Sequence, residues 1–266
     1  MHSADNTERF KALHHTGEPL LLPNAWDFAS AAMLAEAGFP AVGTTSLGVA
    51  VSHGIPDGVG AARTQTIETA RLLARLPFLL TVDIEGGFSE RPDEVALLAA
   101  QLAAEGVAGV NIEDGRQGDR LAGAAEQASL ITAIKEAAPL LFVNARTDTY
   151  WLGITPEPEP TMERLRRYAD AGADGVFVPG AVPVAGIAAI AETIELPLNV
   201  LYREEGPGLS ELGELGVRRV STGSLLFRAS LAATVDAVRK VRAGEPLAGD
   251  MPGYAEVASL TFDQGR

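Results

Sequence analysis

Two acidic side chains close an apolar run near residue 80. Phe78, Leu79 and Leu80 lead into the segment that holds Asp83 and Glu85, and a glycine pair follows. In an extended chain, side chains two residues apart point the same way, so both carboxylates face one side of a predicted strand end. Neighbouring carboxylates repel unless a positive group lies between them, and a divalent cation would meet that need. Oxygen ligands favour Mg²⁺, or Mn²⁺ in its place; the alternative interpretation is a solvated acidic loop.

Other apolar runs also end in polar residues. Gly43 is followed by two threonines and a serine, Glu113 ends the run that begins at Val110, and Arg146 and Asn199 stand in two later runs. Burying so many polar groups without partners would be costly. A pocket that holds water and an ion accounts for all of them together.

The charges of these residues indicate how a substrate is held. Asp83, Glu85 and Glu113 provide three acids for one cation, in part through water. Arg146 is the only cation at the predicted strand ends, and its guanidinium suits a carboxylate or phosphate; the alternative is a structural ion pair with Asp148. A metal that polarises a carbonyl group beside such an arginine describes a 2-oxo acid held for enolate formation.

Two further segments carry candidate residues. The hydroxyls and backbone N–H groups of Thr44, Thr45 and Ser46 suit an anionic group, with an ordinary Ser/Thr turn as the alternative. His53 is the only histidine near a predicted strand end, and its loop position favours a surface residue. Asp57 on the same loop is the better acid–base or positioning candidate, although aspartate before glycine is also common in turns.

Composition excludes several classes of protein. The 266 residues carry a net charge of -14, which disfavours nucleic acid and anionic membrane surfaces as partners. There are no cysteines, so disulfides, thiolate zinc sites and cysteine nucleophiles are excluded. The first residues do not resemble a signal peptide, and no apolar run approaches the roughly 20 residues of a membrane helix. We therefore expect a soluble, cytoplasmic protein.

Prolines and glycines divide the chain at regular intervals. Four prolines open apolar runs, and four glycines end predicted helices just before apolar runs. Both are expected signals, because proline is tolerated at the first residue of a strand and glycine commonly follows the last residue of a helix. The eight predicted strand starts are Pro19, Gly38, Pro77, Gly106, Pro139, Gly172, Pro197 and Gly216.

Eight buried strands that alternate with helices predict an α/β fold of the (β/α)₈ TIM-type barrel. The chain length suits the roughly 250 residues of that fold, so we expect residues 1–266 to form a single barrel domain, led by a helix over residues 5–16. A doubly wound open sheet is the alternative, and the absence of a Gly-x-Gly-x-x-Gly turn disfavours it. Barrel enzymes place their chemistry at the C-terminal strand ends, where the polar residues fall.

Three motifs extend the argument to a known family. Residues 83–88, 109–114 and 144–148 together resemble the isocitrate lyase/phosphoenolpyruvate mutase superfamily, and the resemblance runs from residue 22 to residue 223. It implies an α/β barrel that binds Mg²⁺ and a 2-oxo acid. It also implies that C–C bonds are cleaved or formed, or a phosphoryl group is moved, beside a pyruvate-like enolate.

The resemblance assigns roles to individual residues. It implies that Asp83 is a direct metal ligand and that Glu85 and Glu113 bind the metal largely through water. It implies that Arg146 binds the substrate carboxylate and that Asp57 belongs to a gating loop.

Substrate contacts follow from the same resemblance. Thr45, Ser46 and Leu47 match a turn that holds the substrate, together with the neighbouring Thr44, and Asn199 matches a polar contact in the lyases. The general acid or base is not assigned by position; Asp57, Tyr202 and ordered water stay open.

The departures from the family narrow the activity. The lyases carry a Lys-Arg/Lys-Cys-Gly-His loop where residues 114–120 stand, so lyase chemistry with a thiol acid is excluded. The mutases have tryptophan at Gly43 and histidine at Pro179, which disfavours phosphonopyruvate isomerisation. We expect a Mg²⁺-dependent lyase or decarboxylase that acts on a small 2-oxo or 2-hydroxy (di)carboxylate. The alternatives are a non-catalytic 2-oxo acid binder and a phosphonopyruvate or phosphoenolpyruvate enzyme.

The last predicted helix bears on assembly. Residues 224–242 carry Leu225, Leu231, Val235 and Val238. In relatives the last helix is swapped between subunits, so the resemblance implies a homodimer or homotetramer. The alternative is an ordinary eighth helix packed on its own barrel.

Overall fold

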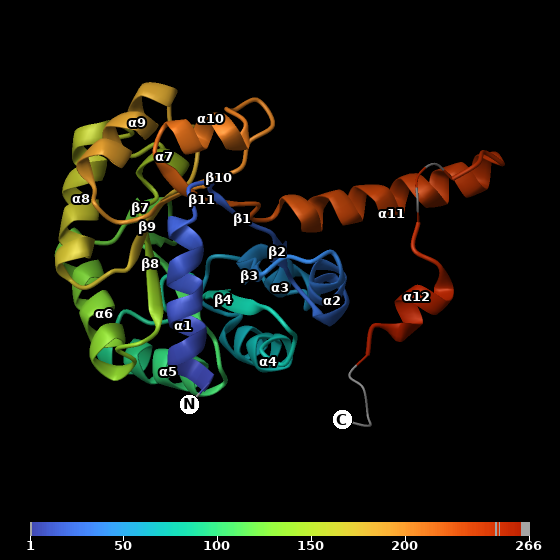
Figure 1. Ribbon diagram of the computed structural model, residues 1–266, viewed down its shortest axis with the longest axis horizontal. Coiled ribbons are helices and arrows are strands. Elements are labelled where there is room, and N and C mark those ends of the chain that lie inside the picture. Colours follow the sequence, from blue (N-terminus) through green and yellow to red (C-terminus); the bar gives the residue numbers. More distant parts are fainter. Residues whose placement is uncertain (1, 248, 250, 262–266) are drawn as a thin grey trace.

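A parallel nine-stranded sheet organises the chain in a computed structural model that describes residues 2–247, 249 and 251–261. β1 (Leu20–Leu22) and β2 (Asn24–Ala25) occupy one strand position, separated only by Pro23. β1 pairs with β11 (Val217–Ser221), while β2 pairs with β3 (Ala41–Thr44). The sheet therefore closes almost completely into a barrel with eight strand positions, which confirms the predicted (β/α)₈ fold (Figure 1).

The seam of the barrel is joined by the side chain of Asn24. Its Oδ1 accepts hydrogen bonds from the Thr222 hydroxyl at 3.2 Å and from the Gly223 backbone N–H at 2.9 Å. Its Nδ2 donates to the Thr44 carbonyl at 2.8 Å. One amide thus links the first strand position to both of its neighbours.

Every strand position begins within three residues of a predicted start. The four predicted helix-ending glycines have φ between 83° and 98°, a left-handed conformation that glycine adopts without steric cost. The local chemistry of these stop signals thus explains why the strands begin where they do. The remaining barrel strands are β4 (Leu79–Asp83), β5 (Gly109–Glu113), β8 (Phe142–Arg146), β9 (Gly175–Val178) and β10 (Leu198–Leu201).

Helices follow the strands in turn and cover the outside of the barrel (Figure 1). A short hairpin of β6 (Gly115–Arg116) and β7 (Arg120–Leu121) follows β5. No helix of the described residues combines the length and apolar character of a membrane span. The helices are α2 (Phe28–Glu36), α3 (Ser46–Ser52), α4 (Arg63–Leu73), α5 (Pro92–Ala104), α6 (Ala124–Ala137), α7 (Thr149–Leu152), α8 (Pro158–Asp170), α9 (Val184–Thr193) and α10 (Leu209–Glu214).

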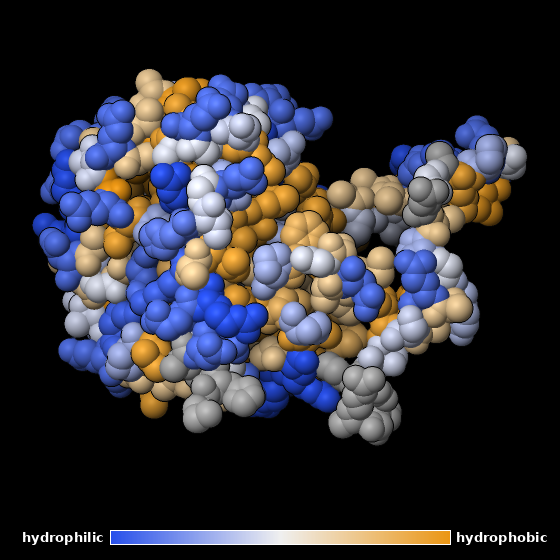
Figure 2. Space-filling view, in the orientation of Figure 1, coloured by the Kyte–Doolittle hydropathy of each residue, from blue (hydrophilic) through white to orange (hydrophobic). Residues whose placement is uncertain are grey.

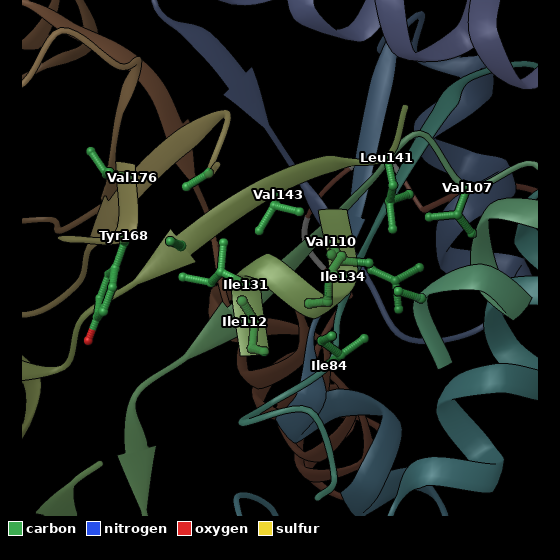
Figure 3. Packing of buried hydrophobic residues seen from close by; sticks show 14 of the residues in the cluster. Ile84, Val107, Val110, Ile112, Ile131, Ile134, Leu141, Val143, Tyr168 and Val176 are labelled. Carbon is green, nitrogen blue, oxygen red and sulfur yellow. The ribbon is translucent and has the colours of Figure 1, made fainter. Parts of the chain in front are cut away.

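The main core lies between the strands and this layer of helices. Figure 3 shows Ile131 and Ile134 of α6 facing Val110, Ile112 and Val143 of the neighbouring strands. All five side chains are completely buried. Burial of each such side chain contributes about 1.5–3 kcal/mol, so this layer fixes the outer wall on which the strand ends are held.

The N-terminal helix closes the opposite end of the barrel from the predicted site. α1 (His2–Ala12) and the 3₁₀ turn η1 (Leu13–His15) bring Phe10 and His14 against Phe142, with the His14 and Phe142 rings stacked at 4.8 Å. Burial lowers the pKa of His14 to about 3, so the imidazole is neutral. The predicted leading helix is therefore present and forms the floor of the barrel.

Beyond its first turn, where Phe227 packs against Trp26, the last long helix does not pack on its own barrel. α11 (Leu225–Ala243) extends away from the barrel body, and α12 (Tyr254–Ser259) follows it (Figure 1). Apolar side chains remain exposed along α11, among them Val238 at 67%, and orange surface appears on this arm in Figure 2. The alternative of an ordinary eighth helix is therefore wrong.

Candidate active site

Three strand ends bring the predicted charges together. Asp83, Glu113 and Arg146 are the last residues of β4, β5 and β8, which are adjacent in the barrel. Glu113 stands opposite Arg146 in the strand register. The side chains therefore meet at the C-terminal rim, as the strand pattern predicted.

Arg146 is held by two carboxylates. Its Nη1 lies 2.7 Å from Glu113 Oε2, and its Nε lies 2.6 Å from Asp148 Oδ1. Burial opposes the charge, but the carboxylates of Glu113 and Asp148 outweigh it and raise the pKa of Arg146. The ion pair with Asp148 that the sequence left as an alternative is thus present, together with a second pair.

Asp83 is positioned by the backbone and by its neighbours. Its N–H donates to the Thr44 hydroxyl at 2.9 Å, and its Oδ1 accepts from the Glu85 N–H at 3.0 Å. Burial raises the pKa of Asp83 to about 6, while the charge of Arg146 acts in the opposite direction. Burial likewise raises the pKa of Glu113 well above its usual range.

Glu85 occupies a strained position. Its φ of 50° is left-handed, which costs a non-glycine residue about 1 kcal/mol or more. The side chain is only 3% exposed; its Oε2 accepts from the Gly60 N–H at 2.9 Å, and its Oε1 has no partner among the described residues. Burial raises the pKa of Glu85 to about 7. Such strain beside an unpaired carboxylate oxygen is typical of functional sites.

The loop that carries Asp57 reaches over the acids. Gly60 of this loop contacts Glu85, and Asp57 Oδ1 is buried without a hydrogen-bond partner in the described structure. Burial raises the pKa of Asp57, against the Ser46 hydroxyl and the charge of Arg146. Asp57 therefore faces the site, whereas His53 is exposed as predicted.

The predicted substrate turn divides into two parts. Thr44 ends β3 and Thr45 precedes α3, and both are buried. The Thr44 hydroxyl is used to hold Asp83, as described above. Ser46 and Leu47 are partly exposed in the first turn of α3, where backbone N–H groups have no intrahelical partner.

Asn199 lies deeper than the rim. It is completely buried in β10, and its Oδ1 accepts from the Ser221 hydroxyl at 3.1 Å. Its Nδ2 has no partner within the described part of the chain. A direct contact between Asn199 and a substrate stays a prediction.

A hollow of about 220 Å³ opens beside the acids. It lies between residues 58–60, residues 85–90 and the β6–β7 hairpin. Arg116 and Arg120 of the hairpin line it, and Arg116 Nη1 donates to the Glu113 carbonyl at 2.8 Å. The prediction that Arg146 is the only cation at these strand ends is therefore wrong. It failed because the sequence did not show that the hairpin folds back over the site and brings Arg116 and Arg120 with it.

Asp114 is a positioning residue that sequence reasoning missed. Its completely buried carboxylate accepts from the Thr147 hydroxyl, the Asp148 N–H, Arg164 Nη1 and the Tyr168 hydroxyl, at 2.7–3.0 Å. The network ties β5 to α8 and to the segment that holds Arg146. The signal available in the sequence was the pair Glu113-Asp114 at the end of a strand. Side chains of adjacent strand residues point to opposite faces, so when Glu113 faces the site Asp114 must face away from it.

The donor set fits Mg²⁺. Glu85 Oε1 and Asp57 Oδ1 are buried carboxylate oxygens without partners in the described structure. No cluster of three or more His, Asp or Glu side chains within that part of the chain surrounds a cation by itself. Mg²⁺ usually takes one or two carboxylates and keeps several waters, so Asp83, Glu85 and Glu113 suit it as one direct ligand with water-mediated contacts.

Comparison with known proteins identifies the family. The chain belongs to the phosphoenolpyruvate phosphomutase family, whose sequence profile matches residues 10–242. It is 47% identical over 256 residues to an uncharacterised protein of Mycobacterium tuberculosis, a match that covers 96% of each chain. It is 32% identical over 207 residues to a 2-methylisocitrate lyase of Bacillus subtilis, covering 74% of this chain and 67% of the lyase. It is 28% identical over 284 residues to an oxaloacetate decarboxylase of Pseudomonas aeruginosa, covering 99% and 95%.

Solved structures agree with this assignment. A protein from Burkholderia cenocepacia superposes with a TM-score of 0.87 at 32% identity, covering 97% of this chain and 95% of that one. A phosphonopyruvate hydrolase in complex with oxalate and Mg²⁺ superposes with a TM-score of 0.83 at 21% identity, covering 96% and 94%; at this identity the likeness shows the fold. The family resemblance is confirmed, and the named relatives include lyases that act on small acids.

Proposed function

We propose that this protein is a Mg²⁺-dependent lyase or decarboxylase that acts on a small 2-oxo or 2-hydroxy (di)carboxylate. The observation that carries the proposal is the convergence of Asp83, Glu85 and Glu113 at two adjacent strand ends, where burial raises the pKa of all three carboxyl groups. The lyase and decarboxylase relatives, and the Mg²⁺ and oxalate in the phosphonopyruvate hydrolase, support the same chemistry.

The side chains have distinct roles in this proposal. Arg146 orients the substrate carboxylate with the guanidinium edge that Glu113 and Asp148 leave available. The backbone N–H groups at Ser46 and Leu47 hold a developing oxyanion beside it. Bound Mg²⁺ would supply polarisation of the substrate carbonyl, held by Asp83 with Glu85 and Glu113.

Asp57 is the proposed proton-transfer residue. Burial raises the pKa of the Asp57 carboxyl above that of a free aspartate, which favours the protonated form that a proton donor needs, and Gly60 of the same loop contacts Glu85. Asn199 of β10, whose buried Nδ2 has no partner among the described residues, is the proposed polar contact to the substrate from within the barrel. We also propose that residues 1–266 act as one barrel domain in the cytoplasm.

A pyruvate-release assay tests the activity. The protein is incubated with Mg²⁺ and oxaloacetate, substituted malates, methylisocitrate or phosphonopyruvate, with EDTA and Asp83→Asn as negative controls. Asp170→Asn, which removes an exposed carboxylate on α8, is the matched control and should leave turnover unchanged. Turnover that survives EDTA contradicts the proposal, and phosphate release from phosphonopyruvate assigns a phosphonate enzyme instead.

Silence across the panel would favour a non-catalytic binder. In that case oxalate should raise the melting temperature only when Mg²⁺ is present, because both would bind one site. The same measurement on Asp83→Asn shows whether the effect belongs to the site.

The arm formed by α11 supports assembly into dimers or tetramers. Leu231, Val235 and Val238 recur at helical spacing and are about half exposed or more, a stripe that a second copy of the chain would bury. Val238→Glu should lower the molar mass in light scattering. Ala233→Glu, on the opposite helix face, should not, and a wild-type monomer would refute the assembly.

A further inference from the structure

The interior of the barrel contains an unusual polar layer. Barrel interiors are normally filled by branched aliphatic side chains. Here the buried interior holds Asn111 of β5, Asn144 of β8, Asn199 of β10 and Arg219 of β11, each at most 5% exposed.

Arg219 is a buried cation with neutral partners. Its Nε donates to the Ser221 hydroxyl at 3.3 Å and its Nη2 to Asn111 Oδ1 at 3.2 Å, and its guanidinium carbon lies 5.9 Å from the centre of the Phe10 ring. Its Nη1 has no hydrogen-bond partner, and no carboxylate lies within ion-pair distance, among the residues that the structure describes. An uncompensated buried charge is costly, so a role for the charge itself is required to explain it.

The contacts of Arg219 connect it to the floor of the proposed metal site. Asn111 stands opposite Asp83 in the register of β4 and β5, and its Oδ1 accepts from both Arg219 and Asn144. Burial lowers the pKa of Arg219 to about 9, against the charge of Asp83, so the guanidinium stays charged at neutral pH. The interior around it is shielded from salt, because screening acts weakly on buried charges.

We propose that Arg219 is a positioning residue whose buried positive charge, placed beneath Asp83 through Asn111, sets the balance of charge in the site. It weakens the affinity for Mg²⁺ and strengthens the affinity for an anionic 2-oxo acid. This inference rests on the proposed function, because it assumes that Mg²⁺ and an anion share the rim. It differs from a packing role, which would change both affinities in the same direction or neither.

The test measures both affinities on the full-length protein by titration calorimetry. Mg²⁺ is titrated into the metal-free protein, and oxalate is titrated at saturating Mg²⁺. Arg219→Met removes the charge and keeps most of the volume, Arg219→Lys keeps the charge, and Arg219→Gln is a second neutral variant if the methionine variant does not fold. Arg218→Met is the matched control, because it lies on the same strand but is not part of the buried interior layer.

Opposite shifts are expected in the neutral variants. Arg219→Met should bind Mg²⁺ on the order of tenfold more tightly and oxalate on the order of tenfold more weakly, and both shifts should persist at high salt. Arg219→Lys and Arg218→Met should match the wild type. Parallel losses of both affinities, or no change in either, overturn the inference.

Failure of the inference is distinguishable from failure of the proposed function. If the wild type binds Mg²⁺ and Asp83→Asn does not, but Arg219→Met behaves like Arg218→Met, only the role of Arg219 is refuted. If the wild type binds no more Mg²⁺ than Asp83→Asn does, the metal site and the role of Arg219 are both refuted.

Discussion

Replacing Asp114 by asparagine removes one of the two acceptor oxygens that join β5, α8 and the segment after β8. The native carboxylate receives four hydrogen bonds, one of them from the charged Arg164. An asparagine keeps one acceptor oxygen and turns its NH₂ group toward donors. About two hydrogen bonds to the charged carboxylate are lost, and each contributes roughly 1.5–3 kcal/mol to stability. Arg164 also loses its buried ion-pair partner, the Asp114 carboxylate.

The expected loss of stability for Asp114→Asn is therefore about 3–5 kcal/mol, a large share of a typical 5–15 kcal/mol. Urea unfolding followed by circular dichroism measures it. The Asp148 N–H also loses its anchor, so Arg146 is held less firmly and kcat/KM should fall by about tenfold or more.

A second, partly buried acid provides the matched control. Asp174 accepts from Lys135 at 2.8 Å and from the Val143 N–H at 3.0 Å, and it precedes β9 at the other end of the strand. Asp174→Asn should lower stability without changing kcat/KM. A loss below about 1 kcal/mol for Asp114→Asn, or the same kcat/KM as wild type, would refute the positioning role.

Three further outcomes follow from the charges of the site. In metal-free protein, burial raises the pKa of Glu85 from 4.5 to about 7, so its contribution to stability is full below about pH 4.5 and is lost as pH rises through 7. Glu85→Gln should therefore raise the melting temperature in EDTA at pH 8 but not at pH 4; equal effects at both pH values would contradict this. Arg146→Lys should lower kcat/KM by about 100-fold, because lysine lacks the bidentate edge, and steady-state kinetics with an Arg166→Lys control on exposed α8 measure it. EDTA should abolish turnover while the far-ultraviolet circular dichroism stays unchanged, since the apolar core does not involve the metal acids; loss of helical signal would contradict this.

The strand pattern was predictable because its signals are local. A glycine with positive φ or a proline at a strand start acts within one or two residues, so Gly38 and Pro19 mark strands without knowledge of the fold. The acids and Arg146 at the rim follow from strand alternation alone.

The supporting network was not predictable for the opposite reason. Arg219 meets Asn111 across 108 residues of chain, and Tyr168 meets Asp114 across 54. Which of many arginines and tyrosines reaches a given acid depends on closure of the barrel and on the angle of each helix. The direction of α11 is also set beyond its own sequence, because an apolar stripe packs equally well on its own barrel or on another copy.

The seam at Asn24 has a consequence for how the chain is made. Asn24 is synthesised well before its partners, because its hydrogen bonds to residues 222 and 223 span 198 and 199 positions. During translation β1 therefore lacks its pairing partner until β11 has left the ribosome. Contacts of such long range slow folding, because the chain between the two partners must lose conformational entropy before the contact can form. The ring can thus close only after β11 is available, and the unpaired edge at β1 is open to edge-to-edge association until then.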